Sequence, residues 1–475
     1  MSASKPDLTT TAGKLADLRQ RLAEAQAPLG SEVVEATHAE GKSTARERVL
    51  QLLDPETFTE TDALARHRIE TFGMDRTKPA TDGVVTGYGL VNGRRVCVFS
   101  QDPTIFDGTL GEVYAEKILK IYDLATKTGV PLIGIYDSAG PRIQEGIVTA
   151  AMYAKILRAA TEASGLIPQL AIVTGAVTDI AALTVPLSDI TIAVEGASVS
   201  ISGESTDNLA HITAPSDTEA VEATRKLIGF LPMNNLAESP LAEVPDTIDA
   251  TGLDEFMPDD DSTAYNVHDI LAKVTDGDLV ELKADQAKNI VTGFAHISGR
   301  SVAVVANQPT AMNGQLTAAA AEKAARFIRM ADAFNLPIVQ FVDSPGFADD
   351  APASAAKLAY AFAEAQVGTI TVVTRKALGA AYVVMGSKDL GADLAFAWPT
   401  AQIALTDANT AAAKLETDAA EYGEANINPY IAAERGLIDA VIEPANTRAS
   451  ITEGLRLLER KVLHPRPKKH GNIPL

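Results

Sequence analysis

The chain has 475 residues, of which 62 are acidic and 41 are basic, so its formal net charge is −21. This charge argues against nucleic acid or an anionic membrane as a partner for most of the surface, because both would be repelled. Cys97 is the only cysteine, which excludes a disulfide framework and a cysteine-built zinc site, and no apolar run is long enough to span a bilayer.

The amino-terminal region is predicted to be helical. Residues 11–26 carry leucines at helical spacing, and residues 43–55 have the pattern of a capped helix that Pro55 ends. A charged helix of this kind is typical of a packing arm or an oligomer contact. The first residues lack the apolar core of a signal peptide, so we expect a cytoplasmic protein.

An internal repeat follows a predicted hairpin that turns at Asn92-Gly93. Residues 85–140 align without a gap to residues 291–346, at an offset of 206, and 19 of the 56 positions are identical. Each copy has the pattern strand, turn, strand, helix, strand and sharp turn. That alternation predicts an α/β fold with a largely parallel sheet, duplicated as a whole domain.

The repeat predicts the domain organisation. We expect an amino-terminal arm over 1–83, a first domain over 84–237, an acidic linker over 238–264 and a second domain over 265–475. The Asp259-Asp260-Asp261 run in the linker could bind a metal, but a solvated acidic linker is the favoured interpretation.

Several catalytic motifs are absent or incomplete in the sequence. There is no phosphate-binding loop, and the S-x-x-K at 354–357 and the K-T-G at 127–129 occur in the reverse of the usual order. Ser138 lacks the glycine two residues earlier that a nucleophile elbow requires. The seven histidines show no metal-type spacing, and His296 is interpreted as a packed or surface residue.

Two sharp turns of small residues remain as candidates for chemistry. In the first, Pro141 suits a helix start, so the N–H groups of Ala139 and Gly140 would point outward at a positive helix end. The second is Gly379-Ala380-Ala381. Such donors stabilise charge that develops on a carbonyl oxygen. Plain strand-to-helix packing uses the same residues and is slightly favoured at each turn alone, although finding such turns in a duplicated fold favours function.

The sequence resembles the carboxyltransferase (β) subunit of biotin-dependent acyl-CoA carboxylases of the acetyl- and propionyl-CoA type. "DSAGPRIQEG" (137–146) is similar to the family signature D-S-G-G-A-R-I-Q-E-G. Further similar segments extend the match over nearly the whole chain: 41–62, 65–89, 100–118, 322–347, 375–388, 428–442 and 468–475.

The resemblance implies two tandem crotonase-like domains in a homo- or hetero-hexamer, with sites between subunits. It implies an acyl-CoA substrate at Ala139 and Gly140 and the biotin cofactor at Ala380 and Ala381, with further substrate contacts at Gly108, Arg142, Gln144 and Gly379. The biotin would arrive as carboxybiotin on a biotin carboxylase/biotin carrier (α) subunit, and a small accessory subunit is a further candidate partner. No metal is implied for this chain.

Departures from the family lie near the chemistry. Asp107 and the pair Asp179-Ile180 stand where the family usually has glycines, and Ala380 also replaces a glycine. The segment between Ser202 and Leu209 is shortened, and glycine-rich stretches are shortened after Phe347 and replaced over 404–419. Two functions therefore stay open: a carboxyltransferase subunit, or a catalytically impaired paralogue that assembles with active β subunits.

Overall fold

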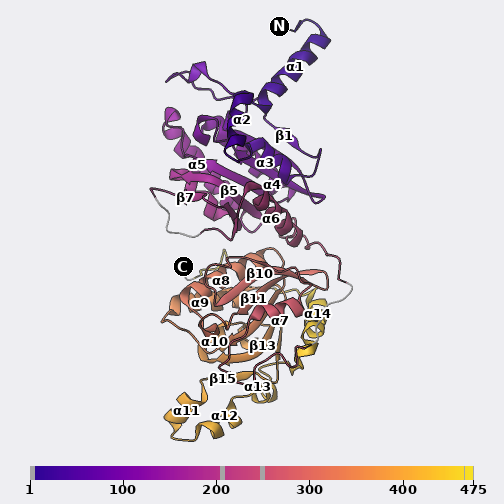
Figure 1. Ribbon diagram of the computed structural model, residues 1–475, viewed down its shortest axis with the longest axis vertical. Helices are drawn as coiled ribbons and strands as arrows, with labels where there is room; N and C mark the ends of the chain where they lie inside the picture. Colours follow the sequence, from indigo (N-terminus) through magenta and orange to yellow (C-terminus); the bar gives the residue numbers. More distant parts are fainter. Residues whose placement is uncertain (1–5, 204–208, 246–251, 465, 474–475) are drawn as a thin grey trace. The chain divides into compact units, whose positions relative to one another are not determined.

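The computed structural model describes residues 6–203, 209–245, 252–464 and 466–473, which divide into two compact units (Figure 1). Unit 1 comprises Met1–Gly229 with Met233–Asn235, and unit 2 comprises Phe230–Pro232 with Leu236–Leu475. The arm predicted over 1–83 packs as part of unit 1, because Val49 and Leu52 are fully buried there.

A mixed sheet forms the centre of unit 1. Its order is β1-β2-β3-β4-β5-β6-β8, with β7 paired to β5. The β2–β3 pair is the antiparallel hairpin predicted at Asn92-Gly93, and β3 to β6 run parallel. The strands are β1 (Thr59–Thr61), β2 (Val84–Val91), β3 (Arg94–Gln101), β4 (Leu132–Ser138), β5 (Gln169–Thr178), β6 (Ile190–Val194), β7 (Ser198–Ser200) and β8 (Ile212–Ala214).

Helices α4 and α5 pack their apolar residues into the same core as the strands of this sheet. In α4, Val113, Ile118 and Ile121 are buried against the sheet, and the helix ends at Gly129, whose φ of +64° is the left-handed cap that favours glycine. The helices are α1 (Thr11–Gln26), α2 (Ser31–Ala39), α3 (Ala45–Leu52), α4 (Glu112–Thr128), α5 (Ile147–Ala163) and α6 (Asp217–Phe230).

Unit 2 has the same plan. Its sheet order is β16-β14-β13-β12-β11-β10-β9, with β15 paired to β13. The strands are β9 (Val280–Glu281), β10 (Ile290–Ile297), β11 (Arg300–Asn307), β12 (Ile338–Ser344), β13 (Thr369–Leu378), β14 (Leu394–Ala397), β15 (Gln402–Ala404) and β16 (Ala440–Val441). The helices are α7 (Val267–Val274), α8 (Ala318–Ala333), α9 (Pro352–Glu364), α10 (Gly379–Val384), α11 (Ala408–Leu415), α12 (Ala419–Asn426), α13 (Pro429–Glu434) and α14 (Thr447–Leu458).

The predicted duplication extends to fine detail. The β4–β5 pairing shifts register between Tyr136 and Ser138, and the β12–β13 pairing shifts between Val342 and Ser344. In each unit a short strand pairs with the carboxyl end of a long parallel strand: β7 pairs with β5, and β15 pairs with β13. Since both shifts occur just before the sharp turns, the two units present these turns in the same way at the carboxyl ends of their parallel strands.

The predicted acidic linker is partly wrong. Leu253 is fully buried in the core of unit 2, where Phe256 and Met257 pack against the same cluster. Asp261 pairs with Lys376 of β13, and Asp260 accepts hydrogen bonds from Ser262. Residues 252–264 are therefore part of unit 2, because the apolar residues among the acidic ones find a core.

Within the described part of the chain, no helix has the length and apolar character needed to cross a membrane.

Candidate functional site

The first predicted turn, after β4, is closed by its own hydrogen bonds. The Ala139 N–H donates to the Asp107 carbonyl oxygen at 3.0 Å, and the Gly140 N–H donates to Ser138 Oγ at 3.2 Å. The prediction that both groups are free and point outward is therefore wrong. The sequence could not indicate this, because the acceptor at Asp107 comes from a loop about thirty residues earlier that returns beside the turn.

The twin turn in unit 2 shares part of this bonding, although Pro345 stands in the place of Ala139 and has no N–H to donate. The Gly346 N–H donates to Ser344 Oγ at 3.4 Å, as Gly140 does to Ser138. The carbonyls of Gly140 and Gly346 each accept a backbone N–H at 2.9 Å, from Leu110 and Leu316 respectively. The repeat therefore preserves a strand-to-helix connection here, which was the packing interpretation considered for the sequence.

The second predicted turn, at the end of β13, is open. Gly379 has a φ of +54°, and it begins α10 with Ala380 exposed and Ala381 fully buried. The first N–H groups of a helix have no partner within it, so this turn offers backbone donors beside the small residues Gly379 and Ala380. A Cβ on Gly379 would lie 3.0 Å from the Leu405 carbonyl oxygen, so both the backbone angle and the space favour glycine.

In unit 1, the residues that correspond to the open turn of unit 2 are Asp179-Ile180-Ala181. β7 pairs with the last three residues of β5, as β15 pairs with the last three residues of β13. Asp179 then takes a φ of +57°, close to the +54° of Gly379. The turn of unit 1 that corresponds in topology to Gly379–Ala381 is thus Asp179–Ala181 and not Ala139–Gly140, because the constant offset of the repeat ends at 140.

Asp179 lies over the closed turn. A Cβ added to Gly140 would come 2.9 Å from the Asp179 Cβ, so the two turns touch at the ends of β4 and β5. The Asp179 side chain is exposed and Ile180 is half-buried. The equivalent turn in unit 2 is Gly379-Ala380-Ala381, so unit 1 has a carboxylate side chain where unit 2 has a glycine.

The residues predicted to contact substrate in unit 1 are mostly internal. Gly108 is buried with a φ of +66°, and a Cβ there would lie 2.4 Å from the Asp137 carbonyl oxygen. Gln144 is half-buried in a short 3-10 helix. Arg142 is 1% exposed, and its guanidinium contacts Asp82 Oδ1 at 2.7 Å and Glu145 Oε1 at 3.2 Å.

Gly108 and Arg142 are therefore built into the interior of unit 1, and the contact of Gly108, Arg142 and Gln144 with a substrate stays a prediction.

An aspartate shared by the two copies precedes each closed turn; Asp137 is half-buried and Asp343 is buried. Asp137 lies 3.9 Å from Arg48 Nη1, and burial raises the pKa of Asp137 although the Arg48 charge opposes this. In unit 2, Asp343 accepts from Arg375 Nε at 2.9 Å. The two arginines come from different elements, α3 and β13, so only the shared aspartate was visible in the repeat.

His296 lies in a hydrogen-bonded row with Asp278 and Ser301. Its Nδ1 contacts Asp278, its Nε2 lies 3.2 Å from Ser301 Oγ, and the Phe230 ring stacks on it at 4.4 Å. Ser301 is 4% exposed, so a substrate carbonyl has no access to its hydroxyl. The interpretation of His296 as a packed residue is confirmed.

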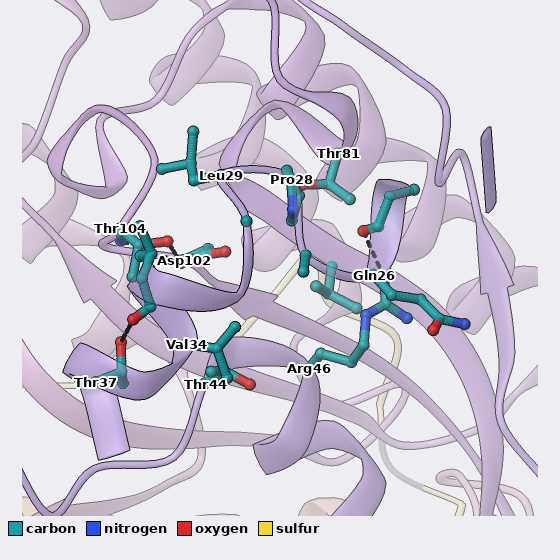
Figure 2. Close-up of a pocket in the computed structure, with 15 residues that line it drawn as sticks. Gln26, Pro28, Leu29, Val34, Thr37, Thr44, Arg46, Thr81, Asp102 and Thr104 are labelled. Atoms are coloured by element: carbon teal, nitrogen blue, oxygen red, sulfur yellow. Dashed lines mark hydrogen bonds between the residues drawn. The ribbon is translucent and has the colours of Figure 1, made fainter. Parts of the chain in front are cut away.

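A separate pocket of unit 1 contains none of the predicted site residues (Figure 2). It lies between the α1–α2 connection, α2, the start of α3 and the residues after β3, with Leu29, Val34 and Asp102 in its wall. Thr81 also lines it, with a buried hydroxyl that has no hydrogen-bond partner and a φ of +69° that is unusual for a β-branched residue.

Comparison with known proteins identifies the family. The carboxyl transferase domain model matches residues 36–210 and 204–473. The beta5 subunit of a biotin-dependent acetyl-/propionyl-coenzyme A carboxylase from Mycobacterium tuberculosis is 44% identical, with 99% of this chain and 96% of that protein aligned. The propionyl-CoA carboxylase beta chain of Saccharopolyspora erythraea is 45% identical, with 100% and 98% aligned. The chain belongs to the carboxyl transferase domain family.

A solved structure extends this likeness to three dimensions. The crystal structure of transcarboxylase 12S, described as a hexamer with hydrolysed methylmalonyl-coenzyme A bound, matches with a TM-score of 0.95 and 39% identity, over 98% of this chain and 99% of that one. The predicted resemblance and the tandem crotonase-like α/β fold are thus confirmed, and this carboxyltransferase is an enzyme by family.

The carboxyltransferase is compact compared with its relatives. The alignment to the Mycobacterium tuberculosis protein runs over 528 positions although this chain has 475 residues, so the chain lacks segments that the relative has. This agrees with the shortened segments inferred from the sequence. Of the shortening predicted between Ser202 and Leu209, residues 204–208 lie outside the described residues.

Proposed function

We propose that this carboxyltransferase is the β subunit of a biotin-dependent acyl-CoA carboxylase. It would transfer a carboxyl group from carboxybiotin, carried by a partner subunit, to the α carbon of an acyl-CoA. The reaction passes through enolates, whose charge lies on a carbonyl oxygen and is stabilised by fixed N–H donors. Carboxybiotin supplies the CO2, and this chain supplies the surface on which the charge is stabilised.

The open turn at Gly379 is the observation that carries this proposal. Ala380 is exposed and Ala381 is buried, so backbone donors stand beside a surface that a flat ring carbonyl can approach closely. We assign the biotin side of the reaction to Ala380 and Ala381, with Gly379 as the residue that aims them. The acyl-CoA side belongs to unit 1, beside the Ala139–Gly140 turn and the Asp179–Ala181 turn that touches it.

The partners follow from the same proposal. Two of the relatives are named as subunits of carboxylases, and transcarboxylase 12S is described as a hexamer. We therefore propose a homo- or hetero-hexamer of β subunits that works with a biotin carboxylase/biotin carrier subunit, with a small accessory subunit as a further candidate. No group of metal-binding side chains occurs among the described residues, and the proposed chemistry requires none from this chain.

One observation favours a second candidate function. Asp179 places a carboxylate at the turn of unit 1 that corresponds to the open turn of unit 2, and a negative charge there opposes enolate formation. On this alternative, the chain would be a catalytically impaired paralogue that assembles with active β subunits and contributes its second turn or its surface.

Reconstitution separates the two candidates. The purified chain is mixed with a biotinylated carboxylase subunit, ATP, bicarbonate and acyl-CoAs of short and long chain, and carboxylated product is measured. Carboxylated product formed without any other β subunit supports an active carboxyltransferase and excludes the impaired paralogue. Silence, followed by activity when an active β subunit is added and co-purifies with this chain, supports the paralogue instead.

A variant pair tests the turn itself. Ala380→Val adds bulk to the exposed position and should lower turnover at least tenfold, since ligand approach is blocked. Ala413→Val, at an exposed position of α11 in the same unit, is the matched control and should leave turnover unchanged. Equal rates for the two variants would count against a role for the turn.

A further inference from the structure

The helix α1 carries an apolar stripe that nothing in the described chain covers. Leu15, Leu18 and Leu22 are 48%, 44% and 41% exposed, and Ala25 is the only buried residue of the helix. Figure 1 shows α1 extending away from the rest of unit 1. Isolated helices of this length are marginal in water, because most helical stability in proteins comes from packing an apolar face. The exposed stripe therefore indicates a missing partner.

The spacing of the stripe specifies the kind of partner. Positions 15, 18, 22 and 25 alternate by three and four residues, which is the a/d pattern of a helix that packs along another helix. The stripe is narrow, since the remaining faces of α1 carry polar residues and small alanines. A narrow seam of this kind favours a second helix over a broad apolar surface.

The charges beside the stripe specify the partner further. On the heptad set by Leu15 and Leu22, the flanking e and g positions carry Lys14, Arg19 and Arg21 besides the uncharged Ala12 and Gln26, while Asp17 and Glu24 fall at c positions, away from the seam. Arg21 is held by Asp17 at 2.8 Å. Basic residues thus border both sides of the leucine seam in a chain whose net charge is −21.

This arrangement disfavours a second copy of the same helix. In a parallel pair, Lys14 would face Arg19 of the other helix, and in an antiparallel pair the e and g positions would face their own kind. Both arrangements bring like charges together at the positions that set partner choice. A membrane surface is also disfavoured, because α1 has no tryptophan or phenylalanine to enter the interface and the acidic chain would be repelled by anionic lipid.

We propose that α1 is a docking helix for an acidic amphipathic helix of a different protein chain. The partner helix would present leucine-type residues at its a and d positions and Glu or Asp at its e and g positions. Its apolar seam would cover Leu15, Leu18 and Leu22, and its carboxylates would pair with Lys14, Arg19 and Arg21. This inference does not depend on the proposed function, because α1 carries none of the residues assigned to the reaction.

Designed peptides on the full chain test the charge requirement. The probe is a fluorescent 21-residue helix with Leu at a and d and Glu at e and g, and its control carries Lys at e and g. We expect the Glu peptide to bind at least tenfold more tightly, with affinity that falls as salt is raised. Lys14→Glu/Arg19→Glu/Arg21→Glu should reverse the preference. Equal binding of both peptides, or binding retained by Leu15→Gln/Leu18→Gln/Leu22→Gln, would overturn the proposal.

A cross-link in the native cell tests the partner's identity. A photoreactive amino acid replaces Leu18, and the linked peptide is sequenced by mass spectrometry. A link to an acidic heptad segment of another protein supports the proposal. A link to a second copy of this chain or to lipid overturns the proposal. Light scattering gives a second test: a smaller oligomer for Leu15→Gln/Leu18→Gln/Leu22→Gln than for the wild type would also overturn it.

Discussion

The substitution Arg142→Met tests whether this residue binds substrate or supports the fold. Arg142 is 1% exposed and Asp82 is fully buried, with a 2.7 Å contact between Nη1 and Oδ1. A second guanidinium nitrogen donates to the Thr109 carbonyl at 2.9 Å. Both partners are buried, so the interaction is not screened by solvent. Removing one member of such a pair leaves the other as an uncompensated buried charge, which costs about 3–5 kcal/mol.

The network has a clear structural purpose. The N-cap residue of helix α4 is Gly111, which has no side chain to cap the helix. Two carboxylates accept its first N–H groups instead: Glu145 Oε2 from Glu112 at 2.7 Å and Asp82 Oδ2 from Tyr114 at 3.0 Å. Arg142 neutralises both carboxylates, so losing it should destabilise unit 1 throughout.

The measurement is unfolding by heat and urea beside substrate kinetics. For a unit of this size, 3–5 kcal/mol should lower the melting temperature of unit 1 by about 6–20 °C. The double variant Arg142→Met/Asp82→Asn keeps an acceptor for Tyr114 but has no unpaired carboxylate at position 82, so it should be more stable than Arg142→Met alone. The reasoning is refuted if Arg142→Met unfolds like the wild type while its KM for propionyl-CoA rises tenfold or more.

Three further predictions follow from single contacts. Asp179→Gly should raise acyl-CoA carboxylation several-fold, and Asp179→Asn, which keeps the shape, should give part of the gain; wild-type rates for both in the reconstituted assay would contradict a role for the charge. Lys323 donates to three backbone carbonyls, and burial lowers its pKa to about 8. Between pH 8 and 10.5, Lys323 carries a proton in the unfolded chain but not in the folded chain. The free energy of unfolding should therefore rise with pH, by up to about 1.4 kcal/mol per pH unit. Lys323→Met should remove this pH dependence from the free energy measured by urea unfolding. An unchanged pH dependence would mean that another group causes it. Gly386→Ala places a Cβ 1.8 Å from Gln340 Nε2 at a φ of +63°, which should cost about 2–4 kcal/mol, and a loss below 1 kcal/mol in urea unfolding would mean that the site relaxes freely.

The repeat made the fold predictable from the sequence, because each copy carries the alternation of an α/β domain and turn residues at matching positions. The hairpin at Asn92-Gly93 and the turns after β4 and β12 were located correctly for this reason. The burial of Leu253 within an acidic stretch was not predictable from composition, since a few apolar residues among many charges find their core only in three dimensions.

The candidate site was less predictable, because a turn's chemistry depends on what lies across from it. Nothing near Ala139 in the sequence indicates that Asp107 would accept its N–H. The correspondence of Asp179 with Gly379 was hidden for a related reason. The offset between the copies changes after residue 140, so only the pairing of β7 and β15 reveals which residues are equivalent.

The two units have diverged in how they present the same backbone. In unit 2, Arg375 from β13 neutralises Asp343 directly, and the following turn carries glycine and alanine. In unit 1, Gly175 occupies the space beside Asp137, where any Cβ would lie within 2.4 Å of the carboxylate. The arginine near Asp137 is Arg48 of α3, whose Nη1 lies 3.9 Å away while its Nε pairs with Asp217 at 2.8 Å. An arginine thus lies near the strand-end aspartate in both copies, but in unit 1 it is shared with Asp217. Asp179 adds a further carboxylate in unit 1 where unit 2 has Gly379, so a functional difference between the two units should follow from this turn.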